Sequence, residues 1–368
     1  MRTPLSEEFG VDLALFAFNY QPDVVIEVCK AGGFGVLGAV RFTPQELKEA
    51  LDYIEANIGG RPYGVDVVMP AKTLAKAGMD VDDMHEMLEQ MIPQGHKDFV
   101  ESVLERYGVP PLPEGTQTGR DLLSWNDTEA RQQVEVSLER RDVKLIVNAL
   151  GAPPKDVVDQ AHEAGVKVAA LVGRKDHALK QVANGVDIIV AQGTEAGGHS
   201  GDIATMILVP EVVEAVSPRP VLAAGGIGSG KQAAAALALG AQGVWTGSMW
   251  LNTIECHQSE IMQKKFREAR SQDAVRSRAY TGKMARQLRT EWTDAWDDPA
   301  NPDPLGMPLQ YMLNSEALER IRLAGREELM GTPIGQLVGS FQDARPVAEV
   351  VATLKDEYAR TVAALPKL

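Results

Sequence analysis

The strongest constraint on the fold is a regular alternation of short apolar runs with helix-like segments. The runs are rich in branched and small residues, as in strands that are buried on both faces. Eight strands are predicted, at 13–18, 34–40, 63–69, 144–150, 166–172, 187–192, 220–224 and 243–246. Helices are predicted between these strands and at the C-terminal end of the chain, at 22–31, 43–57, 153–164, 175–183, 231–239 and 347–365. This pattern predicts an α/β protein with a (β/α)₈ TIM barrel, and a doubly wound parallel sheet is the alternative.

The alternation breaks after the third strand and stops after the eighth. We therefore predict a barrel formed by residues 1–70 and 141–255, a mostly helical insertion at 71–140, and a C-terminal helical cap at 256–368 that packs on the barrel. Within the insertion, a row of residues follows helical spacing: Val81, Met84, Met87, Leu88, Met91 and Ile92. A methionine-rich row is typical of a packing surface, and an adaptable lid over a substrate is the alternative.

Charge and cysteine content narrow the function classes. The net charge of −14 argues against a nucleic acid or an anionic membrane surface as the main partner. Only Cys29 and Cys256 occur, so we expect neither a disulfide framework nor a metal site. The first residues lack the apolar core of a signal peptide, and no apolar run approaches the ~18 residues of a membrane span. We expect a soluble, cytoplasmic protein that acts on a small molecule, with a homo-oligomer left open.

One stretch, Asp187–Ser200, combines a buried strand with a glycine-rich turn that delivers His199. An imidazole with an ordinary pKa of about 6.5 can exchange a proton near neutrality, so His199 is the candidate catalytic residue. The alternative is that it only hydrogen-bonds to hold its loop. For Glu195 we expect a structural role, accepting backbone N–H groups. The other histidines lie in helical or polar contexts typical of surface or packing residues.

A second stretch, Pro220–Lys231, predicts a strand, a glycine-rich turn and the start of a helix. Glycines let backbone N–H groups approach an anion, and the loops after the seventh and eighth strands of a barrel commonly bind phosphate. Trp245–Ser248 supplies the second of these loops. A P-loop is disfavoured because Gln232 stands where a hydroxyl is needed, and the glycine spacing misses the dinucleotide fingerprint. A turn without a ligand is a further alternative.

Both stretches resemble the nitronate monooxygenase family, formerly called 2-nitropropane dioxygenase. The resemblance rests on Ala191-Gln-Gly-Thr-Glu-Ala-Gly-Gly-His-Ser-Gly201, on Leu222–Gly230 and on Trp245–Ser248. It extends to Ala31–Gly38, Tyr63–Asp66 and Gly335–Gly339, and so covers most of the chain. This resemblance implies FMN in the barrel mouth and oxidation of nitronates, or similarly acidic carbon acids, by O₂. His199 would be the base or would orient the substrate.

The resemblance also implies which residues contact FMN. They are Ala17, Phe18, Asn19, Asp66, Gln192, Gly193, Gly197, Gly198, Gly225, Gly226, Gly228, Gly247 and Ser248. Asp66 stands where the family often has asparagine, and the family's usual Pro-Met is absent from the first strand.

Two other functions remain open. An NAD(P)H-dependent FMN reductase of enoyl thioesters or quinones would carry a related loop, and a flavin- or phosphate-binding protein without turnover belongs to a different class. Neither cysteine is placed as a nucleophile at a barrel rim. Tyr280–Arg286, with Trp292, Trp296 and Gln310, either folds over the flavin or forms a purely structural cap. Within that run, Lys283 and Arg286 are candidates to attract an acidic substrate.

Overall fold

Eight parallel strands close into a barrel, which confirms the predicted (β/α)₈ fold. The computed structural model describes residues 1–69, 81–113, 115–116, 127–340 and 343–366. Each strand pairs with the next along the chain, and the eighth pairs with the first. The strands are β1 (Leu15–Asn19), β2 (Phe34–Gly38), β3 (Tyr63–Asp66), β4 (Val143–Asn148), β5 (Lys167–Val172), β6 (Ile188–Gln192), β7 (Val221–Ala224) and β8 (Gly243–Thr246).

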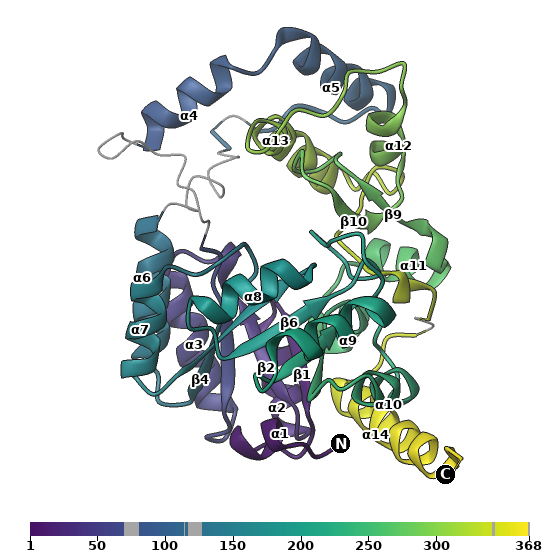
Figure 1. Ribbon diagram of the computed structural model, residues 1–368. Helices are drawn as coiled ribbons and strands as arrows, with labels where there is room; N and C mark the ends of the chain where they lie inside the picture. The colour runs from purple at the N-terminus through teal and green to yellow at the C-terminus, as the bar shows by residue number, and fades with distance from the viewer. Residues whose placement is uncertain (70–80, 114, 117–126, 341–342, 367–368) are drawn as a thin grey trace.

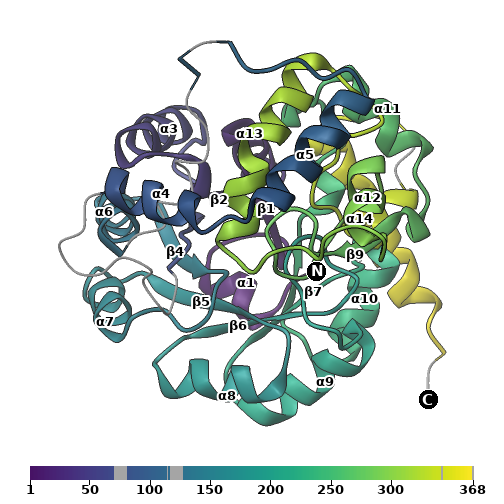
Figure 2. The same ribbon diagram turned by 90° about the horizontal axis from the view of Figure 1, so that it is seen from above.

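A ring of helices surrounds the strands (Figure 2). They are α2 (Pro22–Lys30), α3 (Pro44–Asn57), α6 (Asp127–Leu138), α7 (Lys155–Glu163), α8 (Lys175–Ala183), α9 (Thr205–Val216), α10 (Gly230–Ala238) and α14 (Val347–Ala364). The C-terminal helix α14 packs against α10 and α2 and so closes the ring. Helix α9 was not predicted. It contains Pro210, and a proline inside a helical pattern argues against a helix from sequence alone.

The two faces of the strands build two separate cores. Outward-facing residues pack against the helices, whereas inward-facing ones such as Phe16, Phe34 and Leu145 fill the barrel. Short helix α1 (Pro4–Glu8) covers the amino-terminal ends of the strands. Its Leu5 packs on this interior cluster, as does the neighbouring Phe9, whose ring centroid lies 4.8 Å from that of Phe34. One end of the barrel is therefore filled, and the carboxyl ends of the strands remain for a site.

A cap lies over the other end of the barrel (Figure 1). Its elements are α11 (Glu260–Glu268), β9 (Ala274–Ser277), β10 (Ala285–Leu288), α12 (Glu291–Asp297) and α13 (Leu309–Ala324). Strands β9 and β10 form an antiparallel hairpin that the sequence did not predict. Two insertion helices, α4 (Val81–Gln90) and α5 (Gln94–Arg106), join the same layer. Val100 and Leu104 of α5 pack in one cluster with Trp292 and Trp296, and Leu88 of α4 packs on Met312 of α13.

The methionine-rich row of the insertion divides between two environments. Leu88 and Ile92 are buried against Met312 of α13, which is packing as expected. Met87 and Met91 are 42% and 57% exposed. The side chains of Val81 and Met84, and the parts of the insertion at 70–80, 114 and 117–126, lie outside the described residues. Among the residues that are described, no helix is long and apolar enough to cross a membrane.

Candidate active site

Alternation along the strands decides which predicted residues face the barrel mouth. Phe18 lies two residues beyond the inward-facing Phe16, and its ring stacks on Trp245 with centroids 6.2 Å apart. Gln192 follows the inward-facing Val190 in the same way. Trp245, which was expected in the eighth strand and the turn after it but not among the site residues, therefore lines the mouth. Alternation along this strand places Val244 outward and Trp245 inward.

The side chains of Ala17 and Asn19 lie on the other face of β1. Ala17 packs in the outer cluster between strands and helices. The Asn19 amide oxygen accepts from the backbone N–H of Gln21 at 2.8 Å, and its nitrogen contacts Cys256 Sγ at 3.6 Å. A flavin contact from either residue would therefore use the main chain.

Asp66 ends β3 with a buried carboxyl group that faces the mouth. It is two residues beyond Gly64, which packs closely on the inward-facing Phe34. The side chain is 4% exposed, and its Oδ1 has no hydrogen-bond partner among the described residues. Burial raises the pKa of Asp66 to about 7, although a backbone hydrogen bond from Ala149 opposes the rise. A buried carboxyl oxygen without a partner fits a position next to a ligand.

Glu195 fastens the glycine-rich loop to the start of α9. Its carboxylate accepts the Thr205 backbone N–H at 3.0 Å and the Thr205 hydroxyl at 2.7 Å, so the expected structural role is confirmed. Gly193 is required beside this contact, because a Cβ there would lie 2.1 Å from Thr205 Oγ1. The same hydroxyl is 3.1 Å from the carbonyl oxygen of Gly225. Thr205 thus joins the loops after β6 and β7. It was not among the predicted site residues, because no local sequence pattern marks it.

The other end of the loop is fastened to the cap hairpin. Gly198 and Arg286 form an antiparallel bridge. The Arg286 guanidinium, 7% exposed, donates from Nε to the Thr194 carbonyl at 2.7 Å and from Nη1 to the Ala274 carbonyl at 2.5 Å. Gly197 is equally confined, since a Cβ there would lie 2.8 Å from the backbone of Gly335. Arg286 is therefore a buried anchor, whereas Lys283 is exposed near His199.

His199 is held in one orientation at the edge of this loop. Its Nδ1 lies 3.2 Å from the carbonyl oxygen of Met284. A carbonyl can only accept, so Nδ1 carries the proton and Nε2 keeps a free lone pair. Burial lowers the pKa of His199, the charge of Lys283 lowers it further, and the bond to Met284 opposes the change. The imidazole is therefore a neutral proton acceptor near neutral pH.

The two predicted phosphate loops lie beside the segment that contains η6 (Gln336–Ser340). Gly225 and Gly226 have φ of +101° and +67°, which favour glycine. The Gly335 N–H donates to Ser248 Oγ at 2.8 Å, and a Cβ on Gly228 would lie 2.8 Å from the Leu337 side chain. The structure thus brings Gly228 and Ser248 to one segment.

Several backbone donors in these loops are free. No acceptor within the described chain is assigned to the N–H groups of Gly226, Ile227, Gly247 and Ser248. The Gly228 N–H, in contrast, donates to Gln232 Oε1 at 2.9 Å. A Cβ on Gly247 would meet no atom within 4 Å. Free donors beside open space fit an anion such as a flavin phosphate.

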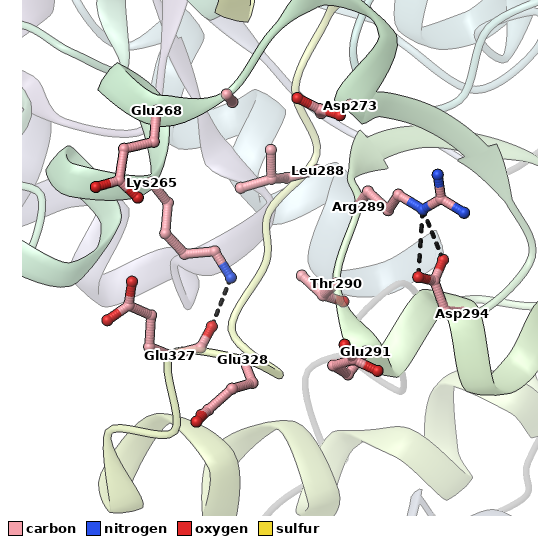
Figure 3. Close-up of a pocket in the computed structure, with 11 residues that line it drawn as sticks. Lys265, Glu268, Asp273, Leu288, Arg289, Thr290, Glu291, Asp294, Glu327 and Glu328 are labelled. Carbon is pink, nitrogen blue, oxygen red and sulfur yellow. Dashed lines mark hydrogen bonds and ion pairs between the residues drawn. The ribbon is translucent and has the colours of Figure 1, made fainter.

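The two tryptophans predicted near the flavin lie in the core of the cap. Trp292 and Trp296 are 0% and 2% exposed in the core of the cap, and Gln310 Nε2 donates to the Ala279 carbonyl at 3.1 Å. A cleft of ≈ 480 Å³ lies in the cap between α11, α12 and the chain at 327–328 (Figure 3). Lys265 and Arg289 line it among six carboxylates, and none of the predicted site residues does. Over the described chain, no group of three or more His, Cys, Asp or Glu side chains could hold a metal ion.

Comparisons with known proteins identify the family. The family model described as nitronate monooxygenase matches residues 18–357. A Mycobacterium tuberculosis protein, Rv1533, provisionally named a monooxygenase, is 47% identical over 376 residues covering 100% of this chain and 99% of that protein. A protein of Staphylococcus aureus named as a probable nitronate monooxygenase is 28% identical, with 90% and 89% covered.

Solved structures show the same fold. The nitroalkane oxidase of Streptomyces ansochromogenes superimposes with a TM-score of 0.80 at 26% identity, covering 98% of this chain and 100% of that one. FabK of Thermotoga maritima superimposes with a TM-score of 0.74 at 24% identity, with 99% and 98% covered. The family implies a flavin, and the unpartnered Asp66 oxygen and the free N–H groups around Gly247 fit one. The chain belongs to the nitronate monooxygenase family and is a flavin-dependent oxidoreductase.

Proposed function

We propose that this enzyme binds FMN and oxidises nitronates, or similarly acidic carbon acids, with O₂. The observation that carries the proposal is the hydrogen bond between His199 Nδ1 and the Met284 carbonyl. It leaves Nε2 as the acceptor, so His199 can remove a proton from an acidic carbon or accept a hydrogen bond from the substrate. The lowered pKa keeps that nitrogen unprotonated at neutral pH.

The proposed FMN site uses the rim of the barrel. The free N–H groups of Gly226, Gly247 and Ser248 would hold the phosphate, and Gly225 supplies the turn. Phe18 and Gln192 would lie near the ring system, and Asp66 would accept a hydrogen bond from it or, when protonated, donate one. Main-chain contacts would come from Ala17, Asn19, Gly193, Gly197 and Gly198. Bound FMN supplies the electron acceptor and the reaction with O₂.

Two comparisons support the substrate class. The family model is that of nitronate monooxygenases, and the Streptomyces protein is a nitroalkane oxidase at 26% identity. The FabK structures, at 23% and 24% identity, support the fold alone. We therefore favour a nitronate over the NAD(P)H-dependent alternative.

Anaerobic mixing of the purified flavoprotein with a single reductant at a time tests the proposal. Reduction of the flavin by propyl-2-nitronate, with reoxidation in air, is the expected result. Reduction by NADH or NADPH and not by the nitronate would assign the enzyme to the reductases instead. Heat release of the flavin followed by chromatography decides between FMN and other flavins.

A further inference from the structure

The hairpin β9–β10 carries two arginines directly opposite each other. Arg276 of β9 is in register with Arg286 of β10. Residues that face each other across an antiparallel pair point to the same side, and like charges in that position are destabilising. Arg286 reaches the Thr194 carbonyl on this side, so the pair faces the loop that carries His199.

Neither charge is neutralised by an ion pair. The Arg276 guanidinium makes no hydrogen bond or ion pair within the described chain, and its Nε is buried without an acceptor. Among the residues that the structure describes, Arg286 donates only to main-chain carbonyls, and burial and the charge of Arg276 lower its pKa. The charge of Glu195 raises the pKa of Arg286, but this carboxylate already accepts two hydrogen bonds from Thr205.

Some arginines of the cap pair with acids, whereas Arg278, like Arg286, donates to main-chain carbonyls. Arg289 pairs with Asp294 at 2.9 Å, and Arg322 pairs with Glu319 at 2.6 Å. The chain as a whole carries a net charge of −14, so carboxylates are abundant. Arg276 is half-buried, and an anion bound to its guanidinium would both satisfy that group and offset the repulsion from Arg286.

We propose that Arg276, held beside the buried Arg286, binds an oxyanion, a carboxylate or phosphate group carried by a small ligand, next to the His199 loop. The guanidinium fork of Arg276 matches the planar oxygens of such groups. The oxyanion belongs to the substrate, because the flavin phosphate is proposed to lie at Gly226, Gly247 and Ser248. This assignment rests on the proposed flavin site but not on the reaction proposed above.

Inorganic phosphate is the probe, with chloride at equal ionic strength as the reference. The thermal midpoint is followed against phosphate concentration for the flavin-loaded and the flavin-free protein, in the wild type, in Arg276→Gln and in the control Arg289→Gln. Arg289 is an exposed residue of the same cap with its own acidic partner. We expect saturable stabilisation of the wild type and of the control, and a loss of phosphate affinity of roughly tenfold or more in Arg276→Gln.

The flavin-loaded protein tests the assignment to the substrate. Phosphate binding to the flavin-loaded protein that Arg276→Gln weakens is the expected result. Binding to the flavin-free protein alone, with weaker FMN affinity in Arg276→Gln, would overturn the assignment and place the flavin phosphate at Arg276. In chloride, Arg276→Gln should unfold at the same temperature as the wild type or higher, because repulsion is relieved. A clearly lower midpoint in chloride, or equal phosphate affinity in all three proteins, would overturn the proposal.

Discussion

Gly198 and Arg286 exchange two main-chain hydrogen bonds, of 2.9 Å and 2.8 Å, so the loop that carries His199 pairs with the cap as a further strand would. Met284, two residues before Arg286, supplies the carbonyl that orients His199. The barrel therefore delivers the imidazole, but the cap fixes its tautomer. Both main-chain contacts come from one short stretch of the cap, and a shift of that stretch would change the proton acceptor.

His199→Asn tests the assignment of the base. The variant should keep its flavin and fold, because the one hydrogen bond of the ring among the described residues is that to the Met284 carbonyl. Turnover of neutral nitroalkanes should fall by about 10²–10⁴, the usual contribution of a general base, while preformed nitronates should lose much less. Steady-state rates with nitroethane and with ethyl nitronate measure the difference. Equal, small losses for both substrates would contradict the assignment.

Lys283→Met tests the electrostatic setting of His199. Lys283 lowers the pKa of His199, so its removal should raise that pKa. A base acts when it is deprotonated, so the wild-type rate should fall as the pH drops below the pKa of His199. In the variant, this fall should begin at a higher pH. The pH dependence of kcat/KM at low and high salt measures the shift. Because Lys283 is exposed, the difference should shrink with salt, and a shift that persists unchanged in high salt would count against a Coulomb cause.

Most of the barrel could be predicted because its signal is local. Each strand reads as a short apolar run, and Thr43 and Glu46 marked the start of α3 by a capping box that the structure contains. Prediction failed for α9, where Pro210 conceals the helix, and for β9–β10, where arginines and polar residues replace an alternating apolar pattern. These two elements hold the His199 loop from either side.

The candidate site was predictable as a set of loops, but not as a set of contacts. Glycines at 225, 226 and 247 mark the turns because their chemistry is encoded locally. The partners of His199 and Glu195 are Met284 and Thr205, and the first lies 85 residues away along the chain. Such pairings follow from how the cap folds back on the barrel, which no spacing in a single sequence records. The flavin roles of the individual residues stay predictions.

Thr205→Val tests the link between the two loops. Valine has the shape of threonine without its hydroxyl, so Glu195 Oε2 loses a 2.7 Å donor and the Gly225 carbonyl loses its contact. We expect a loss of about 1–3 kcal/mol in the free energy of unfolding and weaker flavin retention. Thr205→Ser keeps the hydroxyl and should lose less. Urea unfolding and flavin fluorescence measure both effects, and identical behaviour of valine and serine variants would show that the hydroxyl is not what joins the loops.

Asp66→Asn tests the buried carboxyl. The folded pKa of Asp66, about 7, is raised above its ordinary value of 3.8, so the native state of the flavin-free protein holds the proton more tightly than the unfolded chain. Ionising Asp66 therefore lowers the free energy of unfolding. This loss is absent below the pKa of Asp66 in the unfolded chain, grows as the pH rises, and is complete above the folded pKa of about 7. Between about pH 5 and pH 8 the wild type should lose on the order of 3 kcal/mol relative to the variant. Urea unfolding of both flavin-free proteins at the two pH values measures this, and parallel pH profiles would refute it.

Gly247→Ala separates flavin binding from folding. A Cβ at this position meets no protein atom within 4 Å, and the φ of −132° is negative, so the methyl group should leave the thermal midpoint nearly unchanged. The methyl group would enter the space assigned to the flavin phosphate, so FMN affinity should fall roughly tenfold or more. Gly230→Ala is the matched contrast: its Cβ would lie 2.1 Å from the Tyr358 nitrogen of α14, so it should destabilise the fold itself. Fluorescence titration with FMN and thermal unfolding measure the two properties, and wild-type FMN affinity in Gly247→Ala would place the phosphate elsewhere.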